Sequence, residues 1–447
     1  MPGLLAPFRH RRALLVAGCA LIALAQAAHA EDRLDDIIVT AEKHDTMLQL
    51  APLAITALNA GTLRASNVNE LNDINGLVPG LTIAKSEGAE RVIAIRGIGF
   101  ESAQNPDTQP GVSFNIDGVY IAHVMALAQD LIDVERIEVL RGPQGTVFGE
   151  TSTGGAINVI SHKPELGKLS GNASIGYGNY NLFQSDAALN IPLSETLALR
   201  VAGQYRRHDG YGYATQVPGT NGNYPLSDAN DGAMRAALLW QPAPDFSATL
   251  SVQGFSAKHN AFLQKDILDT NPNPWAVSQD FPGKYHLETR MATLTLEKKL
   301  GDKISLKSVS AYQYLDKNQS SDNDRLASPY YADNILTWQD KSKTFTQEVS
   351  LANAHPQAVE WVLGGFYLHQ SALQNIVEVA TPPAGFFPYN GLNIKFENFA
   401  PFQHSSLAGY GQLSAHVTPK LTIIEGARWQ FDRITAQPSD YFAAPLN

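Results

Sequence analysis

The chain has 447 residues, of which 17% are charged and 44% are hydrophobic, so it is neither a disordered chain nor a bundle of membrane helices. Its 43 acidic residues outnumber its 33 basic ones, and the formal net charge of -10 argues against nucleic acid as a partner. The charge alone would also fit an acidic soluble protein, and the length is enough for two or three domains.

Residues 1–30 have the pattern of a secretory signal peptide. Three arginines between positions 9 and 12 precede an apolar run from Ala13 to Ala25, and Ala28-His29-Ala30 follows as a cleavage site. The run is too short to span a bilayer as a helix. Lipoprotein processing at Cys19, the only cysteine, is the alternative. Because the apolar run continues past Cys19, we expect cleavage after Ala30 and a mature chain that contains no thiol.

A short segment with high β propensity follows within residues 31–45. Its core is Asp36, Ile37, Ile38, Val39, Thr40 and Ala41. An exposed strand of this kind can add to the sheet edge of another protein through main-chain hydrogen bonds, although any short strand would fit this pattern.

Residues 46–165 alternate short apolar segments with glycine-rich turns. Several charged residues here lie next to apolar ones and therefore need partners: they are Arg96, Glu135, Arg136, Glu138 and Arg141. They could pair with one another inside this domain, or with charges on the sheet that follows, such as Arg200, and the sequence leaves both readings open.

Beyond Pro164, long segments alternate polar and apolar residues with a period of two, as Thr196–Arg206 shows best. This alternation predicts β-strands that present one apolar and one polar face. We predict eleven long strands, at 169–178, 181–192, 195–208, 231–241, 246–258, 285–300, 303–316, 337–353, 359–371, 403–417 and 420–434.

The connections between these strands alternate in length, and this alternation distinguishes a membrane β-barrel from a soluble β-sandwich. Tight turns such as 191–194 and 300–302 alternate with long loops near 209–230, 259–284, 317–335 and 372–402. Short turns that alternate with long loops are typical of outer-membrane β-barrels and not of soluble β-sandwiches. Aromatic residues near the strand ends support the barrel, because Tyr and Trp favour headgroup depth: they are Tyr177, Tyr180, Tyr205, Trp240, Tyr312, Tyr314, Trp361, Tyr367, Trp429 and Phe431.

Motifs for catalysis or metal binding do not appear in the sequence. The glycine-rich stretch lacks the Gly-Lys-Ser/Thr ending of a phosphate loop, and there is no His-Glu-x-x-His or Gly-x-Ser-x-Gly. The twelve histidines are scattered without metal-ligand spacing. We therefore expect no enzyme activity and no metal or other cofactor.

The segment from Ile37 to Pro164 resembles the plug domain of TonB-dependent outer-membrane receptors, and of siderophore receptors in particular. The motifs that carry the resemblance are Val78–Leu81, Ile95–Gly99, Asn115–Tyr120, Asp133–Gly149 and Thr153–Ile160. Segments at 347–351, 361–367 and 410–413 also look familial, so the resemblance covers nearly the whole mature chain. Glu150 departs from the basic residue that many relatives have after Gly149, which puts that local contact in doubt.

The resemblance implies a mainly β fold: a small α+β plug domain at 46–165, then a partial antiparallel transmembrane β-barrel at 166–447 with about 11 of 22 strands. It implies that residues 36–41 are a TonB box, which binds TonB, itself driven by ExbB and ExbD. The implied function is active uptake of a scarce nutrient across the outer membrane, with a ferric siderophore as the first choice. Iron then arrives only within a transported chelate.

The plug loop between two predicted strands is the expected ligand contact, with a plain solvated loop as the alternative. The residues concerned are Phe100, Glu101, Gln104, Asn105, Asp107 and Gln109. Uptake of cobalamin or a carbohydrate remains an alternative to iron. A signalling receptor is not expected, because only residues 31–35 lie between the cleavage site and the box.

The last predicted strand heads outward and no closing strand follows it, although bacterial single-chain barrels have an even strand count. The expectation is a truncated product with two open sheet edges. Such a fragment could lack transport activity, and expressed alone it would form no heat-resistant barrel.

Overall fold

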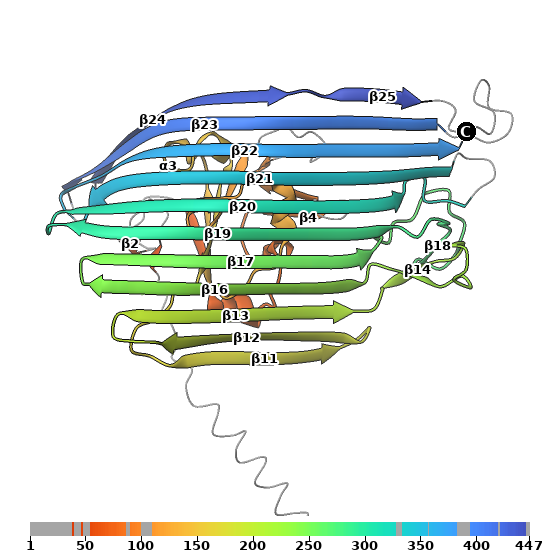
Figure 1. Ribbon diagram of the computed structural model, residues 1–447, viewed down its shortest axis with the longest axis horizontal. Helices are drawn as coiled ribbons and strands as arrows, with labels where there is room; N and C mark the ends of the chain where they lie inside the picture. The colour runs from red at the N-terminus through yellow and green to blue at the C-terminus, as the bar shows by residue number, and fades with distance from the viewer. Residues whose placement is uncertain are drawn as a thin grey trace, which may run out of the picture.

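The computed structural model describes residues 38–39, 46–47, 54–85, 90–99, 110–327, 333–355, 357–381, 394–418 and 421–443. Two bodies of structure follow one another along the chain: an N-terminal domain up to Ser161, and a large sheet, here called the wall, that begins at Ser170. In Figure 1 the N-terminal domain, coloured red to yellow, lies behind the broad face of the wall. Within the residues described, no helix is both long and apolar enough to cross a membrane.

The N-terminal domain is built on a five-stranded sheet in the order β3-β9-β10-β7-β8. Its strands are β3 (Ile55–Asn59), β9 (Val134–Arg141), β10 (Gly155–Ser161), β7 (Val112–Ile116) and β8 (Val119–Tyr120). β10 and β7 are parallel, and the other neighbours are antiparallel. A smaller sheet contains β4 (Leu81–Lys85), β5 (Arg91–Ile95) and β6 (Ile98–Gly99). The short helices are α2 (Ala60–Ala65), η3 (Leu71–Ile74), η4 (Val124–Ala128), α3 (Gly145–Phe148) and η5 (Glu150–Ser152).

The wall is antiparallel throughout, and its order follows the sequence, β11-β12-β13-β16-β17-β19-β20-β21-β22-β23-β24 (Figure 1). The strands are β11 (Ser170–Gly178), β12 (Leu182–Pro192), β13 (Leu197–His208), β16 (Ala229–Ala243), β17 (Phe246–Asn260), β19 (Lys284–Leu300), β20 (Ile304–Asp322), β21 (Asp333–Asn353), β22 (Val359–Thr381), β23 (Ile394–Thr418) and β24 (Leu421–Ala436). A short strand, β25 (Ser439–Ala443), pairs with β23 beyond the end of β24. Among the residues described, β11 pairs only with β12 and the sheet does not close, as a partial barrel requires.

Alternation along each strand decides which side chains face the N-terminal domain. On β19, Met291 and Thr293 are buried on the inner side of the wall, whereas the alternate residues Ala292 and Leu294 are exposed on the outer side. The outer face therefore carries many exposed apolar side chains, among them the predicted girdle residues Tyr177, Tyr180, Tyr205, Trp240, Tyr312, Tyr367, Trp429 and Phe431. Such a face is suited to hydrocarbon and not to water.

The eleven predicted long strands are all present, but several extend further on the long-loop side than predicted. β20 continues to Asp322 and β22 to Thr381, which replaces part of the predicted loops with strand. The predicted loops 209–230 and 259–284 contain β14 (Gly212–Ala214), β15 (Tyr224–Leu226) and β18 (Ala276–Val277), which form a three-stranded sheet. This sheet has its own small apolar core, made of Ala214, Val217, Leu226, Ala261 and Val277.

One apolar cluster joins the N-terminal domain to the wall. It contains domain residues such as Ile95 and Met125 together with wall residues such as Phe255, Leu287 and Trp338. The domain is therefore seated on the inner face of the wall partly by apolar packing.

Candidate functional site: the interface between the domain and the wall

A buried ion pair between the two bodies joins Asp133 to Arg200. Asp133 precedes β9 with a φ of 51°, a backbone conformation that Asp tolerates better than most residues. Arg200, on the inner face of β13, donates from Nε to Oδ2 at 2.7 Å and from Nη2 to Oδ1 at 2.5 Å. Their side chains are only 3% and 7% exposed. This is a buried, two-point contact of the kind that fixes both position and orientation.

Asp117 forms a second contact, from the turn between β7 and β8. Its Oδ1 accepts a hydrogen bond from the Ser161 amide at 2.8 Å, which ties the turn to the end of β10. Its Oδ2 lies 3.3 Å from Nη2 of Arg235 on β16. Arg235 also donates to the His162 carbonyl at 3.1 Å and lies 3.7 Å from Asp133. The two acids therefore share one wall arginine.

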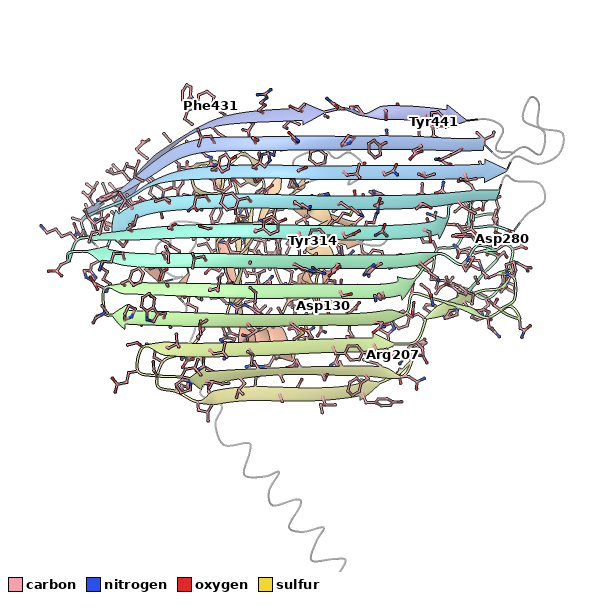
Figure 2. The ribbon with its side chains drawn as sticks, viewed as in Figure 1. Asp130, Arg207, Asp280, Tyr314, Phe431 and Tyr441 are labelled. Carbon is pink, nitrogen blue, oxygen red and sulfur yellow. The ribbon has the colours of Figure 1, made fainter. Side chains whose placement is uncertain are left out.

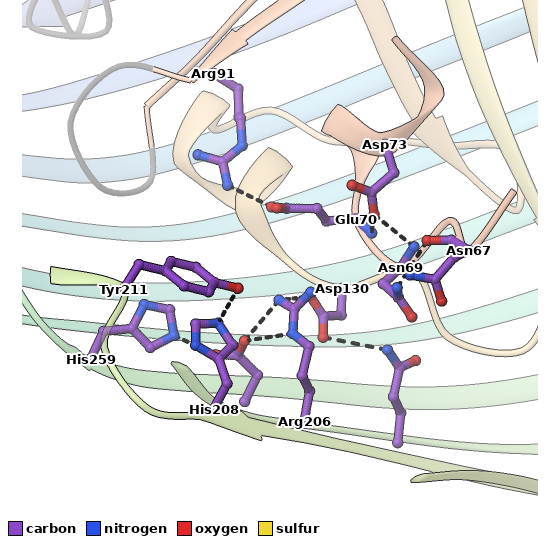
Figure 3. Close-up of polar contacts among 12 residues, drawn as sticks. Asn67, Asn69, Glu70, Asp73, Arg91, Asp130, Arg206, His208, Tyr211 and His259 are labelled. Carbon is purple, nitrogen blue, oxygen red and sulfur yellow. Dashed lines mark hydrogen bonds and ion pairs between the residues drawn. The ribbon is translucent and has the colours of Figure 1, made fainter. Parts of the chain in front are cut away.

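Asp130 is the centre of a third, denser group of charges (Figure 3). Its Oδ1 lies 3.2 Å from Nη2 of Arg206, and its Oδ2 accepts from Gln204 at 3.4 Å. The same Nη2 donates to Asp231 at 2.8 Å, and Asp231 contacts Nε2 of His259 at 2.6 Å. Burial raises the pKa of Asp130 to about 7, because the attraction of Arg206 is offset by the neighbouring acids Asp231, Glu70 and Asp73.

Glu70 and Arg91 extend this group into the N-terminal domain, where Glu70 Oε2 accepts from Arg91 Nη2 at 2.8 Å (Figure 3). Glu70 also forms an isolated β-bridge with Asp130. Burial alone would raise the pKa of Glu70, but Lys85, Arg91 and Arg206 outweigh it and hold that pKa below its usual value. The interface therefore contains one carboxyl that titrates near neutrality beside another that stays ionised.

Further contacts distribute the interface over the wall. Thr289 on β19 donates to the Gln129 side chain at 3.0 Å, and Gln313 on β20 donates to the Tyr120 carbonyl at 2.8 Å. At the far side, the guanidinium of Arg428 on β24 lies against Gly149, whose φ of 89° favours glycine.

A cleft of about 2030 Å³ remains between the N-terminal domain and the wall at the end that carries the tight turns. Charged side chains of both signs line it, including Arg64, Glu135, Lys298, Glu360 and Arg428. On that side the N-terminal domain and the wall are therefore separated by open space with polar and apolar lining, and not by a continuous apolar core.

The predicted site residues fall into three groups. Of the box, Ile38 and Val39 form β1, which pairs with β2 (Thr46–Met47), whereas Asp36, Ile37, Thr40 and Ala41 lie outside the described residues. The predicted ligand loop, Phe100 to Gln109, also lies outside them.

The predicted charge network is described in full, and most of it is internal to the N-terminal domain. Arg136 binds Glu135 at 2.5 Å and Glu138 at 3.0 Å. Arg141 donates to the Pro79 carbonyl at 3.4 Å, and the backbone amide of Arg96 donates to Gly80. Arg200 does contact the domain, but through Asp133 and not through these residues.

The acids that reach the wall, Asp117, Asp130 and Asp133, were not among the predicted residues. Two of them, Asp117 and Asp133, have positive φ, which only folded geometry reveals. The sequence of the wall did indicate that partners exist. Arg200 and Arg206 occupy inner-face positions of one predicted strand, where a buried arginine requires an acidic or polar partner.

Comparisons with known proteins agree with this architecture. Residues 48–156 match the model of the TonB-dependent Receptor Plug Domain. The pesticin receptor of Yersinia pestis is 24% identical over 444 residues, which cover 95% of this chain and 60% of that protein. The iron-regulated outer membrane virulence protein of Vibrio cholerae is 30% identical over 215 residues, covering 42% of this chain and 31% of that protein.

Solved structures share the fold. The ferric yersiniabactin uptake receptor FyuA of Yersinia pestis superposes with a TM-score of 0.70 at 20% identity, covering 88% of this chain and 61% of FyuA. The ferripyoverdine receptor of Pseudomonas aeruginosa gives 0.69 at 16% identity, covering 94% of this chain and 57% of that receptor. The chain thus spans about three fifths of the length of these two receptors. Residues 48–156 are therefore a TonB-dependent receptor plug domain, and the chain as a whole resembles TonB-dependent siderophore receptors in its fold.

Proposed function

We propose that the protein takes up an iron chelate of the siderophore class across the outer membrane, with energy supplied through TonB, ExbB and ExbD. The observation that carries the proposal is the seating of the plug: three of its acids, Asp117, Asp130 and Asp133, contact inner-face arginines of the wall. A wall with an apolar outer face and an internal plug is an arrangement for controlled passage. The relatives support iron, since one is described as iron-regulated and another as a ferric yersiniabactin uptake receptor.

The plug supplies a means of opening. Helix α2 and the end of β3 line the cleft at the tight-turn end, next to Asp245 and Lys298. The N-terminal segment with Ile38 and Val39 precedes β3 and α2 in the chain, so a pull on that segment would act first on the elements of the plug that border free space. The buried pair of Asp133 and Arg200 lies at the same end, close to the cleft-lining Arg235, and would hold that part of the plug against the wall until it is pulled.

Chelate recognition is assigned to the long-loop side, with the plug loop from Phe100 to Gln109 as the proposed contact. The small sheet of β14, β15 and β18 stands on the same side of the wall (Figure 1). In this proposal iron is cargo, and the chain supplies oxygen and nitrogen donors to the chelate rather than to a resident metal.

The test is uptake of ⁵⁵Fe-labelled siderophores by cells that lack their own receptors and express this protein. We expect accumulation that disappears when TonB is deleted. Uptake of labelled cobalamin or of a labelled oligosaccharide with no iron uptake would overturn the assignment of cargo, and TonB-independent entry would overturn the mechanism.

A further inference from the structure

The outer face of the wall contains a sharp boundary between uncharged and charged side chains. On β17, β19, β20 and β21, paired residues form rows across the strands, and three successive outward rows carry no charge. These rows are 248-296-308-349, 250-294-310-347 and 252-292-312-345. On β19 the uncharged stretch separates Lys298 from Arg290, about 27 Å along the strand at ~3.4 Å per residue. With the usual strand tilt, this approaches the ~25 Å apolar band of a membrane barrel.

The next four outward rows, toward the long-loop side, are net basic as a set, although the row that holds Glu288, Asp316 and Lys341 is by itself net acidic. Their positions on the four strands are 254-290-314-343, 256-288-316-341, 258-286-318-339 and 260-284-320-337. They hold five basic residues, Lys258, Lys284, Arg290, Lys341 and Lys343, and two acidic ones, Glu288 and Asp316. This surface, the cationic band, is net positive although the chain carries a net charge of -10.

Contacts inside the band engage its acids and leave its cations accessible. Arg290 Nε donates to Glu288 at 2.8 Å, and its guanidinium lies 5.6 Å from the centre of the Tyr314 ring. Asp316 accepts from Tyr314 at 3.3 Å and from Asn318 at 2.7 Å, and lies 3.7 Å from Lys341. The side chains of Arg290 and Lys341 nevertheless remain 67% and 47% exposed. In the first basic row, Arg290 and Lys343 lie on either side of Tyr314, two strands or roughly 10 Å apart.

We propose that the cationic band binds the phosphates of multiply phosphorylated lipid headgroups in the leaflet on the long-loop side. The proposal rests on the outer-membrane location given above. The band begins where the apolar stretch ends, which is headgroup depth, and it spans neighbouring strands, so that one headgroup can meet several cations. Tyr314, between two of these cations, offers a ring to the apolar part of the lipid and a hydroxyl to its polar part. Glu288 and Asp316 hold the long basic side chains in place.

The experiment compares two variants of the detergent-purified full chain that each lose two positive charges. Arg290→Ala/Lys343→Ala removes the first row of the band, and Lys168→Ala/Lys303→Ala removes two exposed lysines elsewhere. Binding of ³²P-labelled diphosphoryl lipid A in mixed micelles is measured at low and high salt. A surface cation contributes about fivefold to the binding of anionic lipid, so we expect the band variant to bind on the order of tenfold or more weakly and the control as the parent does.

Equal binding by both variants would overturn the proposal. So would equal affinity for phosphatidylcholine, or displacement of the lipid by millimolar inorganic phosphate, because the site would then not recognise a charged lipid headgroup. Neither uptake nor TonB enters this assay. Loss of ⁵⁵Fe uptake with intact lipid binding would count against the proposed function alone.

Discussion

The contact between Arg200 and Asp133 gives the most quantitative prediction. Arg200→Ala leaves the carboxylate of Asp133 buried without its two-point partner, a change that costs about 3–5 kcal/mol in comparable pairs. Arg235, 3.7 Å from the same carboxylate, retains part of the attraction. We therefore expect a cost near the lower end, about 3 kcal/mol, which raises the population of the locally opened plug on the order of 100-fold.

Hydrogen exchange of the protein in membranes measures this opening. The reporter is the amide of His162, which donates to the Asp133 carbonyl at 2.9 Å. Arg207→Ala is the control, because Arg207 lies on the same strand but on its exposed outer face (Figure 2). Adding Asp133→Asn to Arg200→Ala should recover most of the protection. If Arg200→Ala changes exchange at His162 by less than about fivefold, the pair does not hold the plug in place.

Three further predictions concern the plug. The raised pKa of Asp130 favours its neutral form in the seated plug, so the plug should be held less firmly as pH rises through about 7. The population of the opened plug, measured by hydrogen exchange corrected for intrinsic rates, should rise about tenfold between pH 6 and pH 8. Asp130→Asn should abolish this pH dependence, and a dependence that persists would have to come from another group. Gly155→Ala would place Cβ 2.1 Å from the Leu140 carbonyl oxygen at a φ of +149°, so the plug of this variant should lose its resistance to protease. Gly203→Ala is the control and should keep that resistance, because no atom lies within 4 Å of the added Cβ. Equal resistance of the two variants would contradict the tight packing around Gly155. Ile38→Pro removes a main-chain donor from the box and should abolish cross-linking to TonB while siderophore binding is retained; undiminished cross-linking would place the TonB contact outside the box.

Sequence patterns predicted the wall well because each strand carries its own signal. Thr196–Arg206 alternates so regularly that its face assignment, with Arg200 inward, follows from the sequence and agrees with the structure. The extension of β20 was missed because both faces are polar there, and the extension of β22 was missed because apolar residues such as Leu373 and Ile376 fall on both faces; in each case the period of two loses its contrast. The strands β14 and β18 were missed because each is too short to show a period and is stabilised by its neighbours.

The interface could be predicted only in part. An inward arginine such as Arg200 indicates that a partner exists, but which plug acid meets it depends on how the turn at Asp133 docks. Glu138 and Arg136 illustrate the opposite case, since residues two apart on one strand lie on the same face and can pair locally. Local pairing was one of the two open readings, and the structure shows it.

The central claim is that the wall separates lipid from the plug, and spin labels along β19 test it most directly. Single cysteines at 291 to 296, in a Cys19→Ser background, would be labelled in outer membranes and their oxygen accessibility measured. The expected result has a period of two: labels at 292, 294 and 296 meet oxygen dissolved in lipid, and labels at 291 and 293 are shielded by the plug. Uniform accessibility, or contact of the even positions with a water-soluble relaxation agent, would contradict a plug enclosed by a membrane-crossing wall.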